Sequence, residues 1–498
     1  MKDEKSQFKI LREKYPKFVY KNCFYKLKGR NLEISFVFYI EPDITFKPKI
    51  IIENVDKKKL AQIGDSALNN LIFHLGLAEI PSYWKATCSP EIKIEIRFVS
   101  MEKEQIKWWK DLMIQGMGQF FYENKINFKK QNFLKITPIN TNSNFTKFDL
   151  VKFSSAKLSK DKKENRVLVP IGGGKDSIVT LKTLKKIGKN LNCFSLNPTK
   201  AAKKIMKIGD CKKPIIVRRK IDKKLLELNR QGFLNGHTPF SSYLAFLSIL
   251  IAAIFGQKYI AFSQERSSNE GNLKYLNRTI NHQWSKNFNF EKKFRNYTKK
   301  YLTEDINYFS FLRPLYEIQI ARLFSRCPEY FSAFLSCNEA HKTASGTKKP
   351  AKKWCGNCSK CLFVFTTLYP FINKKRLLKI FGKNLFENKK LLLIMRELIG
   401  ERGFKPFECV GTEKESLTAF YLSWKKYRDQ KYRDPLSVKK KYRERVSVKL
   451  PFLLKHFEKK ILPKYPNLEK DSVKILNSWN NQHNLPKEFE KALKKMVS

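Results

Sequence analysis

The chain has 498 residues, of which 42% are hydrophobic, and this length is enough for about three domains with cores of their own. It carries 100 Lys and Arg residues against 45 Asp and Glu, a formal net charge of +55. Such a charge attracts polyanions. However, the excess is mostly Lys, is spread from end to end, and comes with abundant Phe, Ile and Asn. These four residues share A/T-rich codons, so genome composition explains the charge better than a nucleic-acid partner does, although the charge also suits a nucleotide-linked or carboxylated substrate.

The N-terminal part, residues 1–155, is predicted to be an α+β domain that binds substrate. We expect strands within 31–52, broken at Glu41-Pro42, and near 92–99, with helices near 60–77 and 104–124. The first residues contain no continuous apolar run of the signal-peptide type, so we expect a cytoplasmic protein. A charged run, Lys157 to Arg166, is the predicted linker to the next domain.

Residues 156–335 are predicted to form an α/β domain, because strand and helix patterns alternate there as in a parallel sheet covered by helices. The expected strands are 166–171, 192–196, 214–217 and 259–262. Thr238 to Gln257 has no charged residue, but its strongly apolar part, Tyr243 to Phe255, is shorter than a bilayer-spanning helix. We therefore expect a helix packed on the sheet and no membrane contact.

The most informative motif follows the first of these strands and reads Gly172-Gly173-Gly174-Lys175-Asp176-Ser177. A glycine turn between a strand and a helix points backbone amides at an anion, which the helix dipole also favours. The motif is not a Walker A loop, because Val169 stands where the first Gly would be and Asp176 follows the Lys. It resembles the SGGxDS loop of the PP-loop ATP pyrophosphatase superfamily, with Gly172 in place of the first Ser.

This resemblance implies a Rossmann-like parallel sheet and an enzyme that splits ATP between its α and β phosphates. The backbone amides of the motif and the Ser177 hydroxyl would then hold the pyrophosphate. Lys175 would balance phosphate charge, and Asp176 would help to place Mg²⁺. The implied chemistry is adenylation of a substrate with release of pyrophosphate.

Four of the ten cysteines lie between Cys337 and Cys361, with Cys355 and Cys358 in the string WCGNCSKC. Without a secretory signal we expect no disulfides, and this spacing indicates a metal site. Four thiolates suit structural Zn²⁺, which we favour, or an iron–sulfur cluster; His341 is an alternative ligand. The predicted zinc-binding element spans 336–411, and a helical, Lys-rich tail of no assigned chemistry spans 412–498.

Candidates for acid–base chemistry are His237 in NGHTPFSS, His282 in NHQWSKN and Cys88 in YWKATCSP, in that order. Structural roles explain each of them nearly as well, because a histidine before a helix often caps it and cysteine is often buried. Glu265 and Glu270 follow the strand at 259–262, where open α/β sheets bind ligands, and are candidates to hold metal or substrate.

Several strings together narrow the resemblance to one family. PIGGGKDS, NGHTPFSS, NHQWSKNFNFE, YFSFLRPLYEIQIA, CGNCSKC and PFECVGT resemble the bacterial UDP-N-acetyl-α-D-muramoyl-L-alanyl-L-glutamate epimerases, over roughly residues 30 to 415. FVFYIEPDITFKPKI and SYWKATCSP add to this resemblance. The family implies ATP-dependent inversion of the substrate's terminal L-glutamate through an acyl adenylate, with release of AMP and pyrophosphate, in the synthesis of peptidoglycan precursors.

The same resemblance implies a UDP-linked muramoyl dipeptide as substrate and functional coupling to the ligase that adds L-glutamate. Two other interpretations remain at this point. One is a PP-loop enzyme that adenylates a nucleobase or tRNA, since 7-cyano-7-deazaguanine synthases carry a comparable four-cysteine zinc site. The other is a non-enzymatic zinc protein that binds nucleic acid.

Overall fold

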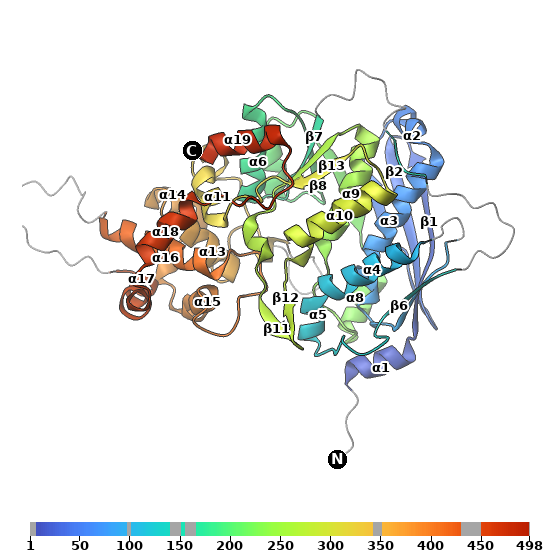
Figure 1. Ribbon diagram of the computed structural model, residues 1–498, viewed down its shortest axis with the longest axis horizontal. Coiled ribbons are helices and arrows are strands. Elements are labelled where there is room, and N and C mark those ends of the chain that lie inside the picture. The colour runs from blue at the N-terminus through green and yellow to red at the C-terminus, as the bar shows by residue number, and fades with distance from the viewer. Residues whose placement is uncertain are drawn as a thin grey trace, which may run out of the picture.

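A computed structural model of the chain describes residues 6–96, 101–139, 151–154, 166–341, 351–429 and 450–497. Its strands are β1 (Lys17–Lys28), β2 (Asn31–Ile40), β3 (Ile44–Phe46), β4 (Lys49–Ile52), β5 (Glu91–Ile94), β6 (Lys135–Pro138), β7 (Arg166–Pro170), β8 (Asn190–Leu196), β9 (Ile215–Lys220), β10 (Tyr259–Phe262), β11 (Leu273–Tyr275), β12 (Arg278–Ile280) and β13 (Asn307–Ser310). Within the described residues, all but β11 and β12 join one sheet, in the order β13-β10-β7-β8-β9-β4-β2-β1-β5-β6, with β3 beside β2 (Figure 1).

The direction of the strands divides this sheet. The run β13-β10-β7-β8-β9 is parallel, as the alternating pattern predicted for all of these strands except β13, and β1, β5 and β6 are also parallel to one another. Between them, β9, β4, β2 and β1 pair antiparallel. From β7 the chain adds β8 and β9 on one side and then returns to place β10 on the other side. Ligands of open α/β sheets bind at such a reversal, at the carboxyl ends of the strands.

One sheet contains strands from both of the first two predicted domains. The strands β4 and β9 pair through Ile50 with Arg219 and through Ile52 with Val217. The proposed boundary near 155 and nearly all of the predicted linker lie outside the described residues. The strand expected near 92–99 is β5, which ends at Ile94, and its last expected residues are likewise not described.

The helices of the first half are α1 (Gln7–Lys14), α2 (Lys57–Ile63), α3 (Asp65–Trp84), α4 (Lys103–Gly116), α5 (Gly118–Glu123), α6 (Lys175–Lys186), α7 (Lys200–Ile208), α8 (Lys223–Arg230) and α9 (Phe240–Phe255). Those of the second half are α10 (Phe288–Tyr301), α11 (Glu317–Phe324), α12 (Asn338–His341), α13 (Ser359–Leu368), α14 (Lys374–Phe381), α15 (Leu392–Leu398), α16 (Glu413–Asp429), α17 (Phe452–His456), α18 (Leu468–Asn477) and α19 (Lys487–Val497).

Helices cover both faces of the parallel strands, and each strand divides its side chains between two cores. On one face, Leu168 and Tyr308 pack with α3, α9 and α10. On the other, Val167, Val169 and Phe309 pack with α6, α11 and α13. Neighbouring strand residues point to opposite faces, so the continuous apolar run in β7 is the expected sequence of a strand buried on both sides.

The uncharged segment from Thr238 to Gln257 forms α9, a core helix that is buried along nearly its whole length. Gly256 ends it with φ +64°, in the left-handed conformation that glycine adopts at helix ends. This agrees with the prediction of a helix packed on the sheet. None of the helices in the described parts of the chain has the length and apolar character needed to cross a bilayer.

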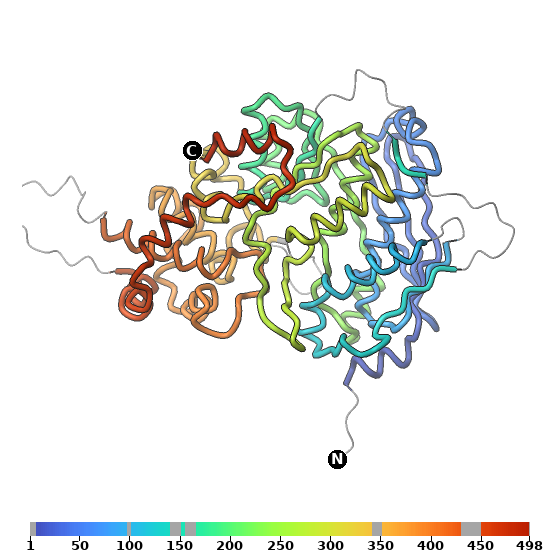
Figure 2. The backbone as a smooth tube through the Cα atoms, viewed as in Figure 1, coloured from blue at the N-terminus to red at the C-terminus, as the bar shows by residue number. Residues whose placement is uncertain are grey.

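The C-terminal segment is mostly helical where it is described, with an irregular stretch at 478–486, and it returns to the parallel sheet. The tube in Figure 2 runs from the helices around α18 back to α19, which lies beside α6. There the Phe489 ring packs 5.0 Å from the ring of Tyr259 and 4.9 Å from that of Phe309. The tail therefore covers part of the face of β10 and β13 on the side of α6.

One expectation about cysteines is wrong. Cys193 in β8 and Cys211, just after α7, form a disulfide with Cα atoms 6.0 Å apart. The spacing in sequence gave no sign of this pair, because it is the packing of α7 against the sheet that brings the two residues together.

Candidate functional site

The glycine motif lies at the reversal of strand order, between β7 and α6. Gly174 is the N-cap of α6, and Gly173 has φ +107°, which side-chain-bearing residues rarely adopt. A Cβ on Gly173 would lie 3.3 Å from both the Ala201 Cβ and the Thr199 Oγ1. The first amides of a helix have no partner within it, so this loop presents backbone donors at the carboxyl end of a central strand. The Ser177 hydroxyl donates to the Gly174 carbonyl at 3.0 Å.

Lys175 is a buried cation between two carboxylates. Its ammonium donates to Asp176 at 2.5 Å and to Glu317, the first residue of α11. The side chains of Lys175 and Glu317 are each 2% exposed, whereas that of Asp176 is 26% exposed. Burial and the charge of Glu317 raise the pKa of Asp176, against the effect of Lys175. Asp176 is thus the carboxylate of this group that a ligand can reach.

Glu317 also lies next to a second cation, Lys360, which belongs to the cysteine-rich segment. Lys360 Nζ lies 3.7 Å from Glu317 Oε1. Burial alone would raise the pKa of Glu317, but the charges of Lys175 and Lys360 lower it, so this carboxyl is ionised. The backbone amide of Lys360 donates to the Glu408 carboxylate at 2.5 Å, and its ammonium donates to the Cys409 carbonyl.

A second group of titratable side chains continues from this point. The Lys286 ammonium donates to Cys409 Sγ at 2.9 Å, and His282 Nε2 lies 4.0 Å from the same sulfur. Burial opposes the charge on Lys286, but its interactions with Cys409 and Glu265 outweigh burial and raise the pKa of Lys286. The site therefore holds a sulfur between a cation and an imidazole.

The two predicted histidines are neighbours, with ring centroids 4.4 Å apart. Gln119 orients His282, because its amide nitrogen donates to Glu123 at 2.8 Å and its oxygen accepts from His282 Nδ1 at 2.5 Å. The hydrogen of His282 then sits on Nδ1, and the lone pair of Nε2 faces Cys409. Burial and the charges of Lys286 and Lys405 lower the pKa of His282 to about 3. Burial and His282 also lower that of His237, so both rings are neutral at pH 7.

The two predicted glutamates have different surroundings. Glu265 follows β10 and is buried, and burial together with the charges of Glu317 and Asp176 raises its pKa to about 7. Glu270 lies farther out, where it pairs with Lys405 at 3.2 Å. Only Glu265 therefore shares the electrostatic environment of the glycine motif.

Cys88, the third candidate for acid–base chemistry, lies in surroundings that differ from those of the two histidines. It is buried in the N-terminal half, and Arg12 donates to its carbonyl at 2.6 Å with the same guanidinium nitrogen 4.0 Å from its sulfur. Burial raises the pKa of the Cys88 thiol, which keeps it protonated. The hydrogen-bond partners of Cys88 among the described residues are Arg12 and the Trp84 carbonyl, and not the two histidines or the glycine motif.

The four predicted metal ligands come together. The Sγ atoms of Cys337, Cys355, Cys358 and Cys361 all lie within 4.8 Å of one another. Four thiolates around Zn²⁺, with Zn–S bonds of about 2.3 Å, place their sulfurs about 3.8 Å apart, and Cys355 and Cys361 are 3.6 Å apart. The residues thus fit a tetrahedral metal such as zinc. Because Lys360 lies between two of the ligands, this site also determines where its ammonium points.

Comparison with known proteins agrees with this arrangement. The family described as MurL N-terminal domain matches residues 9–311, and the one described as MurL C-terminal domain matches residues 333–449. The chain belongs to the MurL family. The N-terminal match includes the glycine motif and both histidines, and the C-terminal match includes the four cysteines. Glu317 lies between the two matches, and residues 450–498 lie beyond them.

Three curated relatives carry the name UDP-N-acetyl-alpha-D-muramoyl-L-alanyl-L-glutamate epimerase. The protein of Xanthomonas oryzae pv. oryzae is 32% identical over 339 residues, which are 68% of this chain and 71% of that protein. Those of Salinispora tropica and a Micromonospora species are each 37% identical over 52% and 53% of this chain. The matched part spans just over half of these two proteins, 55% and 58%.

Four residues of this MurL-family site received no role from the sequence: Glu317, Lys360, Lys286 and Cys409. Each lies in a string that carried the family resemblance, namely YEIQIA, CGNCSKC, NHQWSKN and PFECVGT. No spacing rule joins them, because their partners are far away in the chain. Strand order alone brings Glu317 to Lys175, which is 142 residues earlier.

Proposed function

We propose that this chain is an ATP-dependent epimerase that converts the terminal L-glutamate of UDP-N-acetylmuramoyl-L-alanyl-L-glutamate to D-glutamate, with release of AMP and pyrophosphate. The names of the three relatives support the substrate and the inversion. The glycine motif at the reversal of strand order, next to buried Lys175, supports the use of ATP. That placement is the observation that carries the proposal.

The chemistry explains why ATP is needed. Removing a proton beside a carboxylate would place two negative charges on neighbouring atoms, at high energetic cost. When the carboxylate attacks the α-phosphorus of ATP, an acyl adenylate forms and pyrophosphate leaves. The α-carbon is then a stronger acid, so a positioned base removes its proton, reprotonation occurs on the opposite face, and water cleaves the adenylate.

The glycine motif binds the leaving pyrophosphate in this proposal. The amides at the start of α6 donate to its oxygens, and the helix dipole favours its charge. The Lys175 ammonium donates to both Glu317 and Asp176 and so fixes the positions of these two carboxylates. Glu317 raises the pKa of both Asp176 and Glu265, and Asp176 raises that of Glu265, so a cation suits the space near these carboxylates. Mg²⁺ held by these carboxylates would neutralise phosphate charge.

We assign the proton transfers to Cys409 and His282, and treat His237 as the residue that packs behind His282. The low pKa of His282 makes it a weak base by itself. The Cys409 sulfur is the second proton carrier in this proposal, because the Lys286 ammonium donates to it at 2.9 Å and His282 Nε2 lies 4.0 Å from it. Burial of Cys88 with Arg12 makes that residue the weakest of the three original candidates.

The assignment predicts the behaviour of Cys409→Ala. Epimerisation should fall by about 10²-fold or more, because a positioned general base contributes rate factors of this size, while adenylate formation, measured as pyrophosphate exchange into ATP, should persist. Incorporation of deuterium from solvent at the α-carbon reports the lost step. Cys327→Ala, at a buried cysteine outside the site, is the control. Equal deuterium incorporation by Cys409→Ala and wild type would exclude Cys409 as the proton carrier.

The overall function is tested with purified protein, ATP, Mg²⁺ and the L-alanyl-L-glutamate muramoyl nucleotide. Chiral analysis of the released amino acids should show D-glutamate, with AMP formed alongside it. If the glutamate remains entirely L while ATP is consumed, the chain is a PP-loop enzyme with another acceptor and not an epimerase.

A further inference from the structure

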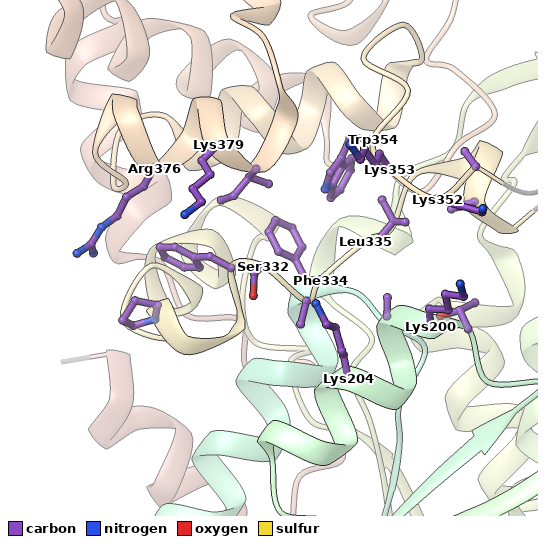
Figure 3. Close-up of a pocket in the computed structure, with 18 residues that line it drawn as sticks. Lys200, Lys204, Ser332, Phe334, Leu335, Lys352, Lys353, Trp354, Arg376 and Lys379 are labelled. Atoms are coloured by element: carbon purple, nitrogen blue, oxygen red, sulfur yellow. The ribbon is translucent and has the colours of Figure 1, made fainter.

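A large cavity beside the glycine motif has no part in the proposed chemistry. It has a volume of about 970 Å³ and lies between the start of α7, residues 328–335, Trp354 and α14 (Figure 3). Among the described residues that line it there is no Asp or Glu. Six cations line it instead: Lys200, Lys204, Lys352, Lys353, Arg376 and Lys379.

One wall of the same cavity is apolar, and its three rings are largely buried in the core behind it. Phe331, Phe334 and Trp354 line it, and the rings of Phe334 and Trp354 lie 5.3 Å apart. In Figure 3, Arg376 and Lys379 approach from α14, opposite Lys204 on α7. Lys and Arg bind phosphate oxygens by charge-assisted hydrogen bonds, and an apolar wall next to them suits the flat, weakly polar surface of a base. The lining is therefore that of a site for a nucleotide with several negative charges.

The position of the cavity distinguishes between two nucleotides. It adjoins the glycine motif, because Leu335 donates to the Gly173 carbonyl at 2.9 Å and Thr199 lies against Gly173. Yet neither Lys175, Asp176 nor any other residue of the titratable group lines it. In ATP only the ribose separates the base from the reacting α-phosphorus, so adenosine binds nearer to those groups than the uridine diphosphate of the substrate does. The uridine diphosphate of the substrate is separated from its glutamate by the muramoyl and alanyl units, so it requires a site at a distance.

We infer that this cavity binds the uridine diphosphate end of the substrate, with the base against the apolar wall next to Trp354 and the two phosphates among the six cations. The inference rests on the proposed function, which supplies the nucleotide-linked substrate. It assigns the zinc-binding segment a second use, because Trp354 directly precedes Cys355. The segment then contacts the substrate at one end and places Lys360 against Glu317 at the other.

Binding of UDP itself to the full-length protein, measured by calorimetry without turnover, tests this inference. In the double variant Arg376→Ala/Lys379→Ala, the Kd for UDP should rise about tenfold or more, since each lost charge-assisted contact to phosphate is expected to weaken binding severalfold. The Kd for ATP should stay within about twofold. Lys375→Ala, an exposed residue of the same helix that does not line the cavity, should leave both values unchanged.

Both substituted residues are exposed, and Lys204→Ala on α7 offers an independent variant on the opposite wall. Unchanged UDP affinity in the double variant and in Lys204→Ala would overturn the inference. Loss of ATP binding in place of UDP binding would also overturn it and assign the cavity to adenosine. If UDP binds here but no glutamate is inverted, the cavity assignment stands and the proposed function fails. If the variants at Arg376, Lys379 and Lys204 invert glutamate with an unchanged KM for the substrate, the proposed function stands and the cavity assignment fails.

Discussion

Asp176→Asn is expected to abolish formation of AMP and pyrophosphate while leaving the fold intact. The substitution keeps the size of the side chain and removes its negative charge. Lys175 remains paired with Glu317, so no buried charge loses its last partner. The carboxylate that is lost is the accessible one of the group, at 26% exposure. We expect the rate of pyrophosphate release to fall by about 10²–10³-fold or more, the range for loss of one group that stabilises transition-state charge.

Pyrophosphate release in the presence of the muramoyl nucleotide is the measurement. Asp210→Asn is a matched control, because Asp210 is exposed and has φ +47°, a conformation that asparagine adopts readily. The control should retain wild-type activity and stability. If Asp176→Asn releases pyrophosphate at the wild-type rate, Asp176 does not take part in binding metal or phosphate. The proposal that the glycine motif binds pyrophosphate would then lose support.

The second large effect concerns the four cysteines. Cys358→Ser is expected to lower the metal content from one zinc per chain to nearly none and to decrease the free energy of unfolding, on the order of several kcal/mol, because binding to a closed thiolate site contributes directly to folding. Activity should fall as well. The reason is geometric: Lys360 lies between Cys358 and Cys361, and its contact with Glu317 depends on the position of that turn.

Elemental analysis and thermal unfolding measure the two effects. Cys327→Ser, at a buried cysteine that donates to the Leu323 carbonyl and lies outside the cluster, should keep its zinc. If the purified protein contains iron and no zinc, the four cysteines are assigned to an iron–sulfur cluster instead. A zinc-free Cys358→Ser protein with wild-type stability and activity would contradict a structural metal altogether.

The sequence predicted the parallel part of the sheet well, because its strands are short apolar runs bounded by turn residues. The strand β10 was predicted at its observed bounds, 259–262, whereas β13, at the edge of the same parallel run, was not predicted. The strand β1 was not predicted. Its pairing with β2 shifts register between Tyr20 and Asn22, so the alternation of buried and exposed residues changes phase within the strand. A search for alternating apolar and polar residues therefore does not detect such a strand.

The site was predictable only where its residues are close in sequence. The spacing of the cysteines indicated their cluster, and the glycine motif indicated its own loop. Glu317 and Cys409 join the site through packing between distant elements, which no local pattern encodes. The two histidines were identified as candidates, but their contact, and the burial that lowers their pKa values, follow from the packing of α5 and the segments around them.

The fate of the oxygen atoms of the substrate carboxylate tests most directly whether an acyl adenylate forms. Substrate labelled with oxygen-18 in the α-carboxylate of its glutamate is incubated with the protein, ATP and Mg²⁺, and the nucleotide products are analysed by mass spectrometry. Attack of the carboxylate on the α-phosphorus, followed by hydrolysis at the acyl carbon, leaves one labelled oxygen in AMP for each D-glutamate formed. D-glutamate formed with unlabelled AMP, or with ADP and phosphate, would contradict the proposed mechanism.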